Sequence, residues 1–358
     1  MKKLIISSAI LKVALAKLGQ AINAKSTLLI LTNLFCKVTP GQIELIATNL
    51  EITIFYRLEC ESKESFEFLI PFEEFNRIVA FYKDCPLIIE SGKVIKIKGN
   101  DDVFDIKMGE KIETFPKLQE LPKKNGFEIS TDILHCLHTA LTTTGKSDGN
   151  PIFANVLVDL SDGKITVAST NGSHVVFSKE FESENKEVQE LLLSQKVIKV
   201  LEGSEKVNIV YHQKAIGFVT EKITIINTRT EQKYVNFRAI FPQDWPANLT
   251  IEKTVLLEAL SKCSVVSDML HKASVSFESK KDIRFTAEDE ILNVNVSVPG
   301  VYTGKVKETA VNTEMLAKLL HQIEHDEIEL AIHDSKRAII LTLKEDPGYK
   351  ALLMPIAV

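Results

Sequence analysis

One pattern of strand and helix repeats along the chain and limits the folds that it can adopt. Three stretches, at residues 4–22, 127–144 and 249–267, begin alike with a strand-like segment, a polar or Thr/Ser cap and an amphipathic helix. A second helix candidate follows in each third, at 70–83, 191–203 and 310–325. Alternating apolar segments such as IELAIHDSKRAIILTL then predict strands. The sequence therefore predicts one unit of strand, helix and several strands, used six times.

Two proline-containing segments separate the repeats into domains. FPKLQELPKKNG (115–126) and FRAIFPQDWPAN (237–248) each carry paired prolines, which interrupt helices and central strands. We therefore expect three similar domains, at residues 1–124, 125–246 and 247–358. Each would place two helices on one side of antiparallel sheets, which is an α+β arrangement with one helix face buried and the other free.

Composition excludes several classes of protein. With 358 residues, 45% of them hydrophobic and 25% charged, the chain can bury large cores. Its longest apolar runs are too short to span a bilayer, and Lys12 and Lys17 interrupt the apolar N-terminal stretch. Five scattered cysteines without a CxxC pair suit a reducing compartment, so we expect a cytoplasmic protein. The net charge of −5 argues against a nonspecific nucleic-acid coat but leaves a local basic surface possible.

One short motif resembles a catalytic site. HQIEH (321–325) matches H-x-x-E-H, in which two histidines bind zinc and the glutamate acts as a base. On a helical projection Glu324 lies away from both histidines, and no third ligand segment is marked downstream. The sequence also has no G-x-G-x-x-G, Walker loop or G-x-S-x-G. We therefore expect no cofactor, no metal and no catalytic residue, and a zinc-dependent hydrolase is the disfavoured alternative.

Six segments carry recognisable motifs, in order along the whole chain: STLLILTNLFCKV (26–38), IELIATNLEITI (43–54), FPKLQELP, VASTNGSHVV (167–176), FRAIFP (237–242) and ALLMPIAV. They resemble, in the same order, the P-I-L-x-N-L, A-T-D-L-E-I, F-P-x-L, A-T-D-G-H-R-L-A, Y-R-x-V-L-P and V-M-P-M-R-L motifs of the bacterial DNA polymerase III beta subunit, the DNA sliding-clamp family. The resemblance is weak for each motif alone and strong for the ordered set.

This resemblance implies a noncatalytic processivity factor. In the family, two chains close head to tail into a six-domain ring around double-stranded DNA, with helices lining the channel and sheets outside. Such a ring holds phosphates loosely and reads no bases. It tethers the DNA polymerase III catalytic subunit, the clamp loader and repair proteins through short linear motifs. A clamp-like scaffold that binds peptides without enclosing DNA is a second alternative.

The resemblance also implies three sets of site residues. The DNA-channel candidates are lysines, although solvated helix faces also carry Lys: Lys12, Lys25, Lys196, Lys199 and Lys262. The dimer-interface candidates, which are alternatively ordinary core residues, are Phe104, Ile106, Val265 and Val266. The partner-peptide cleft would contain Phe153, Thr170, Gly172, His174, Val175, Pro242, Ala338, Leu352, Leu353, Met354, Pro355 and Ile356.

The apolar C-terminal segment is the feature that the cleft explains best. Termini normally carry polar residues, yet YKALLMPIAV is almost entirely apolar after Gly348. The alternative is that this segment is only a final buried strand. Four residues depart from the family pattern: Ser173 and His174 stand where His-Arg is usual, Ala357 replaces the penultimate Arg, and Lys25 stands where an Arg near the channel is common. We therefore expect a less cationic cleft.

Overall fold

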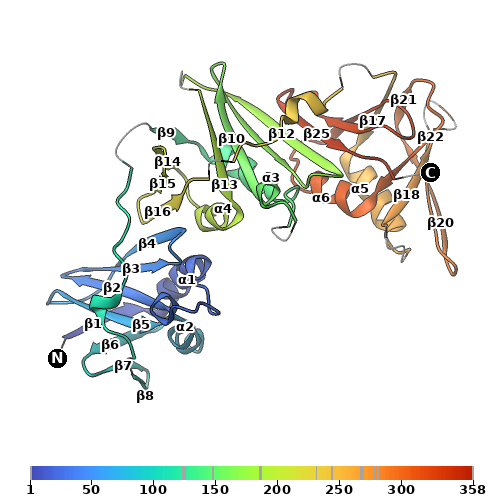
Figure 1. Ribbon diagram of the computed structural model, residues 1–358. Coiled ribbons are helices and arrows are strands. Elements are labelled where there is room, and N and C mark those ends of the chain that lie inside the picture. Colours follow the sequence, from blue (N-terminus) through green and yellow to red (C-terminus); the bar gives the residue numbers. More distant parts are fainter. Residues whose placement is uncertain are drawn as a thin grey trace. The chain divides into compact units, whose positions relative to one another are not determined.

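The predicted unit of strand, helix and strands recurs six times in the part of the chain that the structure describes (Figure 1). This structure is a computed structural model. It describes residues 2–107, 109–122, 126–146, 149–184, 188–230, 232–242, 245–266, 270–277, 279 and 282–356. Ala357 lies outside these ranges.

The first three units contain the following elements. The first has β1 (Lys2–Ser7), α1 (Ser8–Leu18), β2 (Asn33–Thr39), β3 (Gln42–Thr48) and β4 (Ile52–Glu59). The second has β5 (Phe66–Pro71), α2 (Phe72–Ala80), β6 (Pro86–Ser91), β7 (Val94–Gly99) and β8 (Asp102–Lys107). The third has β9 (Gly126–Ile129), α3 (Thr131–Leu141), β10 (Asn155–Ser161), β11 (Lys164–Thr170) and β12 (Val175–Glu182).

The last three units follow the same order. The fourth has β13 (Gln189–Ser194), α4 (Gln195–Leu201), β14 (Val207–Tyr211), β15 (Ala215–Val219) and β16 (Ile223–Thr228). The fifth has β17 (Ala247–Glu252), α5 (Lys253–Cys263), β18 (Lys272–Ser276), β19 (Asp282–Glu288), β20 (Asn293–Pro299) and the short β21 (Val301–Thr303). The sixth has β22 (Glu308–Asn312), α6 (Thr313–Leu320), β23 (Glu327–Ile332), β24 (Ile339–Thr342) and β25 (Tyr349–Leu353).

Antiparallel pairing joins these strands into four sheets. Two sheets have four strands each, in the orders β1-β6-β7-β8 and β20-β19-β18-β22. The other two are longer because strands from different predicted domains pair at their edges. β4 pairs with β16 in an eight-stranded sheet, and β12 pairs with β25 in a nine-stranded sheet. The α+β class predicted from the sequence is thereby confirmed.

Helix ends follow ordinary capping chemistry. Before α1, the Ser7 hydroxyl accepts a hydrogen bond from the Ala9 N–H, and before α6 the Asn312 side chain accepts one from Met315. The inner face of α1 buries Leu11, Ala14, Leu15 and Leu18. Each helix thus presents one apolar face to the core and leaves another face free.

The chain also divides into two larger compact bodies, called unit 1 and unit 2 from here on, which are described separately below. Unit 1 comprises Met1–Leu134 and Lys196–Glu231, and unit 2 comprises His135–Gln195 and Gln232–Val358. Their boundary passes through the middle predicted domain because the β4–β16 and β12–β25 pairings draw its two halves to different neighbours. The domain limits at 124 and 246 stay a prediction.

The two proline-containing segments pack against the sheets. In unit 1, the Phe115 ring lies 5.1 Å from the Phe35 ring, measured between centroids, and Leu121 fills the space above Gly217. In unit 2, the segment from Tyr234 to Trp245 contributes aromatic side chains to the main apolar cluster. No helix in the described ranges is long and apolar enough to cross a membrane.

Candidate functional site

The turn between β11 and β12 is built by side chains of its own residues. The Thr170 hydroxyl donates to the Val175 carbonyl at 2.6 Å and accepts from the Gly172 N–H at 3.0 Å. The Asn171 side-chain oxygen accepts hydrogen bonds from the N–H groups of Ser173, His174 and Val175, at 2.8–3.2 Å. These bonds give the turn one defined shape, so the two outer residues Ser173 and His174 are held in place.

Only glycine fits at position 172. Its φ of +82° lies in the left-handed region, and a Cβ built there would meet the Phe153 ring at 2.4 Å. Phe153 comes from the 3-10 helix Pro151–Ala154, which precedes β10. The sequence thus brings an aromatic ring directly beneath the backbone of the turn. Phe153, Thr170 and Gly172, all predicted for the cleft, therefore lie together.

The C-terminal segment runs beside this turn. β25 pairs with β12, where Val175 faces Leu353, and the Met354 N–H donates to the His174 carbonyl at 2.8 Å. The Ile356 N–H donates to the Ala310 carbonyl at 3.1 Å. Leu352 and Leu353 are buried, whereas Met354 is 39% exposed. The tail is therefore a core strand as far as Leu353 and a partly exposed segment beyond it.

An apolar cluster lies beneath the turn and the tail. Ala338 and Leu352 belong to it, and Phe153 packs against it. The sequence did not predict several of its other members: Ile152, Val176, Tyr234, Val235, Phe237, Phe241 and Trp245. Three of these side chains, Phe237, Phe241 and Trp245, come from the second proline-containing segment, whose aromatic content was the available signal. Pro242 is half-buried and directly follows Phe241.

The side chain of Arg238 holds the second proline-containing segment against the sheet. The Arg238 guanidinium donates to the Asp159 carboxylate at 2.7 Å and to the Thr166 hydroxyl at 3.2 Å, and it lies over the Phe237 ring. Asp159 is buried, so this charged pair is shielded from water on one side. Burial raises the pKa of the nearby Tyr234 phenol to about 12, which keeps it neutral. Tyr234 is therefore a neutral member of the cluster.

The predicted channel lysines have different surroundings. Lys196 and Lys199 are exposed on α4, and no ion pair forms to either within the described ranges. Lys25 is exposed in the loop after α1, where its N–H donates to the Asn23 side chain. Lys262 pairs with Glu258 at 2.7 Å on α5, and this hydrogen bond lowers the pKa of the Glu258 carboxyl. Its charge is therefore partly offset.

The outer face of α1 differs from the expectation. Lys12 was expected to be exposed, but it is half-buried, while Ile10 and Val13 are 46% and 55% exposed. Lys17 turns to α4, where its ammonium group donates to the carbonyls of Val200 and Glu202 at 2.9 and 2.6 Å. Burial lowers the pKa of Lys17. This lysine stabilises the carboxyl end of α4, a role that the sequence did not indicate.

The four predicted interface residues divide into exposed and buried pairs. Phe104 on β8 is half-buried and stacks on Phe81, which is 75% exposed. Val265, just after α5, is 66% exposed. Ile106 and Val266 are buried in their own units. Phe104 and Val265 are therefore the two that present apolar surface in the single chain.

The HQIEH segment does not form the helix that its motif requires. α6 ends at Leu320, and β23 begins at Glu327, so His321 and His325 do not face the same way as residues i and i+4 of one helix. His325 lies 3.0 Å from Glu345 instead. Among the described residues, no group of three or more His, Cys, Asp or Glu side chains is arranged to hold a metal ion.

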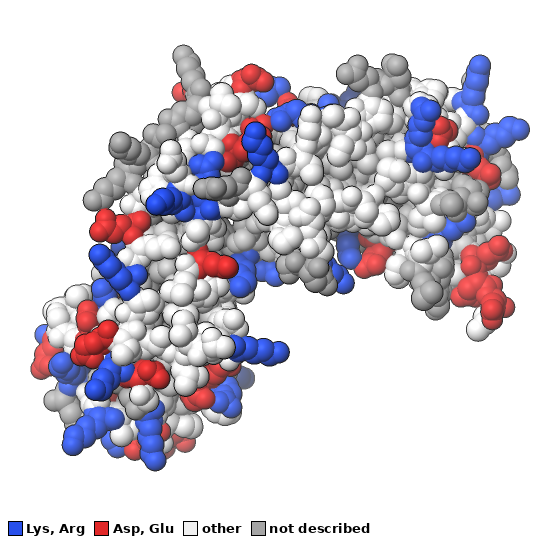
Figure 2. Space-filling view, in the orientation of Figure 1, with Lys and Arg blue, Asp and Glu red and all other residues white. Residues whose placement is uncertain are grey.

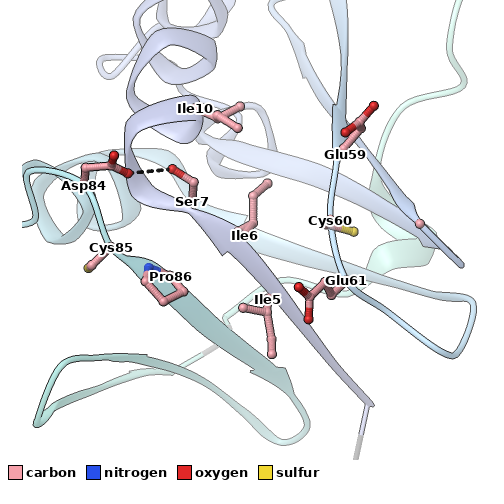
Figure 3. A pocket seen from close by; sticks show the side chains of 11 residues that line it. Ile5, Ile6, Ser7, Ile10, Glu59, Cys60, Glu61, Asp84, Cys85 and Pro86 are labelled. Atoms are coloured by element: carbon pink, nitrogen blue, oxygen red, sulfur yellow. Dashed lines mark hydrogen bonds between the residues drawn. The ribbon is translucent and has the colours of Figure 1, made fainter.

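A separate hollow lies in unit 1, where β1, the start of α1 and the segment after β4 meet (Figure 3). It has a volume of about 750 Å³, with Ile5, Ile6 and Ile10 on its apolar side. Three carboxylates, those of Glu59, Glu61 and Asp84, line the remainder, and Asp84 accepts a hydrogen bond from Ser7 at 3.1 Å. No residue predicted from the sequence lies in this hollow.

Comparisons with known proteins agree with the motif resemblance. Residues 238–357 match the family model of the DNA polymerase III beta subunit, C-terminal domain. The beta sliding clamp of Rickettsia felis is 19% identical over 100% of both chains, and that of Staphylococcus epidermidis is 22% identical over 94% of both. The resemblance to the sliding-clamp family is confirmed.

Solved structures extend the agreement to the fold. The sliding clamp of Bacillus subtilis aligns with a TM-score of 0.90 at 16% identity, over 100% of this chain and 99% of that one. The DNA polymerase III beta subunit of Thermotoga maritima aligns with a TM-score of 0.88 at 19% identity, over 100% of both. The sliding-clamp fold of three similar α+β domains, predicted from the sequence, is therefore confirmed.

Proposed function

We propose that the protein is a DNA sliding clamp, a homodimeric ring that encircles duplex DNA and tethers the replicative polymerase and other partners. The observation that carries this proposal is that strands from different predicted domains pair at the edges of their sheets. β4 pairs with β16 and β12 with β25, both antiparallel, whereas β8 and β20 are outer strands of four-stranded sheets. Outer strands offer backbone N–H and C=O groups for pairing.

The same pairing rule applied between two chains closes a ring. Antiparallel pairing of β8 of one chain with β20 of a second would join two four-stranded sheets into eight strands, as in the β4–β16 sheet. Two such junctions use both ends of each chain, which is closed two-fold symmetry. The exposed ring of Phe81, stacked on Phe104, supplies apolar surface beside β8, and Val265 supplies it on unit 2.

In this proposal the free helix faces hold the DNA backbone. Lys196 and Lys199 are the strongest candidates because both are exposed on one helix. Lys25 adds a loop cation, while the salt bridge of Lys262 and the partial burial of Lys12 reduce their contributions. Loose contacts of this kind bind phosphates without sequence preference, which suits sliding.

Partner peptides would enter at the turn and tail of unit 2. The Phe153 ring, the open backbone at Gly172 and the exposed Met354 offer apolar and hydrogen-bonding surface over one cluster. Each apolar anchor in such a groove contributes roughly 1.5 to 3 kcal/mol when fully buried. A few anchors therefore give about micromolar affinity, which permits exchange among partners.

Encirclement is tested by topology. Loaded onto a nicked circular DNA, the protein is expected to stay bound at moderate salt and to dissociate once the circle is cut. Its solution mass, measured by light scattering, is expected near twice 40.0 kDa. A strict monomer at high concentration, or retention that ignores the DNA ends, would contradict the ring. Peptide binding without any topological retention would favour the scaffold that does not enclose DNA.

The lysine assignment needs its own variant. Replacing Lys196 and Lys199 with Glu is expected to shorten retention on the circle, with the free energy of unfolding changed by less than about 0.5 kcal/mol because both side chains are exposed. Lys344→Glu, on an exposed turn after β24, is a matched control. Equal retention in the double variant and the control would remove both lysines from the DNA surface.

A further inference from the structure

A second hollow, in unit 2, is lined by residues close in sequence to members of the apolar cluster. It has a volume of about 430 Å³ and is lined by Pro246, the loop Lys305–Glu308 and the loop His333–Ser335. Three of the segments that build the cluster also lead into the hollow. Trp245 precedes Pro246, Ala331 lies two residues before His333, and Ala338 follows the second loop. The segments that line the hollow are therefore continuous in sequence with segments that build the cluster.

The first loop is held rigidly. Gly304, with a φ of +144°, packs so closely on Ala247 that a Cβ would meet it at 2.3 Å. The Tyr302 hydroxyl donates to the Val306 carbonyl at 2.7 Å, and the Phe277 N–H donates to the Lys307 carbonyl at 2.9 Å. Lys305 and Lys307 thus project from a fixed backbone, which lowers the entropy lost when they bind a ligand.

The second loop uses its own carboxylate to build its shape. Asp334 accepts the N–H groups of Lys336 and Arg337, each at 2.8 Å, and contacts the Arg337 guanidinium at 3.4 Å. These hydrogen bonds, the one from the Lys336 N–H first, lower the pKa of Asp334. The negative charge of Asp334 is therefore already offset within the loop.

The remaining charges favour an anionic ligand. Lys305, Lys307 and Lys336 are exposed, and no ion pair forms to any of them within the described part of the chain. Glu308 is the other carboxylate lining the hollow. Lys and Arg side chains gather over β21 and β22 in the space-filling view (Figure 2).

We propose that the hollow binds a carboxylate-rich flank of the partner peptide whose apolar part occupies the cleft. This inference rests on the proposed function, because it assigns a chemistry to the partners of the same site. The ligand is an acidic segment of protein, since the loops that line the hollow adjoin, in sequence, residues of the cluster that the peptide would occupy. The protein would discriminate among partner peptides by the charge of this flank. Two peptides with the same apolar residues would differ in affinity according to the charged residues beside them.

The test uses matched peptides on the full-length protein. A fluorescein-labelled clamp-binding peptide of a bacterial DNA polymerase III catalytic subunit is extended by three glutamates or by three glutamines, at either end in turn. Fluorescence anisotropy at low salt measures the affinity of each. We expect one end to show about a tenfold preference for glutamate, the size of two or three exposed charge pairs, and high salt to remove it.

Variants assign that preference to the hollow. Lys305→Gln with Lys307→Gln is expected to abolish it while leaving the affinity for the glutamine peptide unchanged, and Lys344→Gln, at the other end of β24, is expected to retain it. Equal binding of both peptides by the unaltered protein, or a preference that survives the double variant, overturns the inference and leaves the cleft intact. Binding of neither peptide contradicts the proposed function and the inference together. Loss of DNA retention in the double variant, with the peptide preference kept, assigns the lysines to nucleic acid instead.

Discussion

Two turns of the molecule share one hydrogen-bonding pattern and have different surroundings. In unit 1, the turn Thr48–Ile52 lies between β3 and β4, and in unit 2, the turn Thr170–Val175 lies between β11 and β12. In each, the threonine hydroxyl donates to the carbonyl of the last residue, at 3.2 Å and 2.6 Å. In each, the following asparagine accepts backbone N–H groups, two from the unit 1 turn and three from the unit 2 turn.

The two turns differ in where a large side chain lies. The residue with positive φ is Leu50 in unit 1, at 76°, and Gly172 in unit 2, at 82°. In the 3-10 helix that precedes each turn, the size difference is reversed. The smaller Leu31 stands in LILTN of unit 1, and the larger Phe153 stands at the same place in PIFAN of unit 2. In unit 2 a large ring therefore lies beneath a turn without a side chain. The comparison teaches that an open turn over an aromatic ring can arise when large side chains change position within a repeated motif while its hydrogen bonds are kept.

The largest expected effect comes from giving the unit 2 turn the unit 1 residue. Gly172→Leu forces a side chain into the Phe153 ring at an unfavourable φ, so we expect unfolding free energy to fall by about 2 to 5 kcal/mol and peptide binding to be lost. The reciprocal Leu50→Gly is expected to change stability by less than about 1 kcal/mol, because glycine tolerates this φ. Urea denaturation and peptide anisotropy measure both. Normal peptide binding by Gly172→Leu would show that the open turn is irrelevant to the groove.

The asparagines provide the next comparison. Asn171→Ala leaves three backbone N–H groups without their acceptor, and Asn49→Ala leaves two. We expect each to lower the free energy of unfolding by about 1 to 3 kcal/mol, with the larger loss for Asn171. Only Asn171→Ala is expected to weaken peptide binding as well. An equal loss of binding in both variants would mean that the effect is general destabilisation.

A smaller effect is expected from the tail that covers only the unit 2 turn. Met354→Ala with Pro355→Ala keeps the backbone hydrogen bond to His174 and removes partly exposed side chains. We expect a stability change below about 1 kcal/mol, since surface substitutions are usually mild, and about a tenfold loss of peptide affinity. Sedimentation is expected to give unchanged assembly. If the variant binds peptide normally, the tail serves only as a core strand.

The smallest effect is expected at Gln119, whose side chain makes weak hydrogen bonds to the unit 1 turn. The Gln119 amide donates to the Leu50 carbonyl and the Thr228 hydroxyl at 3.4 and 3.5 Å, which are long hydrogen bonds. Gln119→Ala is therefore expected to change the free energy of unfolding by less than about 0.5 kcal/mol in urea denaturation. A loss above about 1 kcal/mol would show that the unit 1 turn depends on these hydrogen bonds.

The repeated unit was predictable because its signals are local. Alternating strands and capped helices are visible in any one unit, and the motif resemblance adds their order. The boundary between unit 1 and unit 2 was not predictable, because β4–β16 and β12–β25 pair residues that are far apart in sequence. Helix length also misled: the segment 310–325 suggested a helix through His325, but α6 ends at Leu320.

The site was predictable where residues build their own turn. Thr170, Gly172 and Val175 are recognisable from the motif because their chemistry is local. Within the connector 237–248, only Pro242 was expected in the cleft, since prolines mark a linker and do not tell what Phe237, Phe241 and Trp245 pack on. The expected exposure of the Lys12 side chain was wrong for a related reason. A helical projection does not include the neighbouring elements that cover this side chain.

The outer strands β8 and β20 also bear on how the protein should be handled. For most proteins, dilution protects against aggregation because encounters between chains become rarer. In the proposed ring the interface would consist of strand edges, so dilution below the dissociation constant would uncover two rows of backbone donors and acceptors. Uncovered edges accept any strand of suitable pattern. Dilute stocks held for long periods should therefore lose material that concentrated stocks retain.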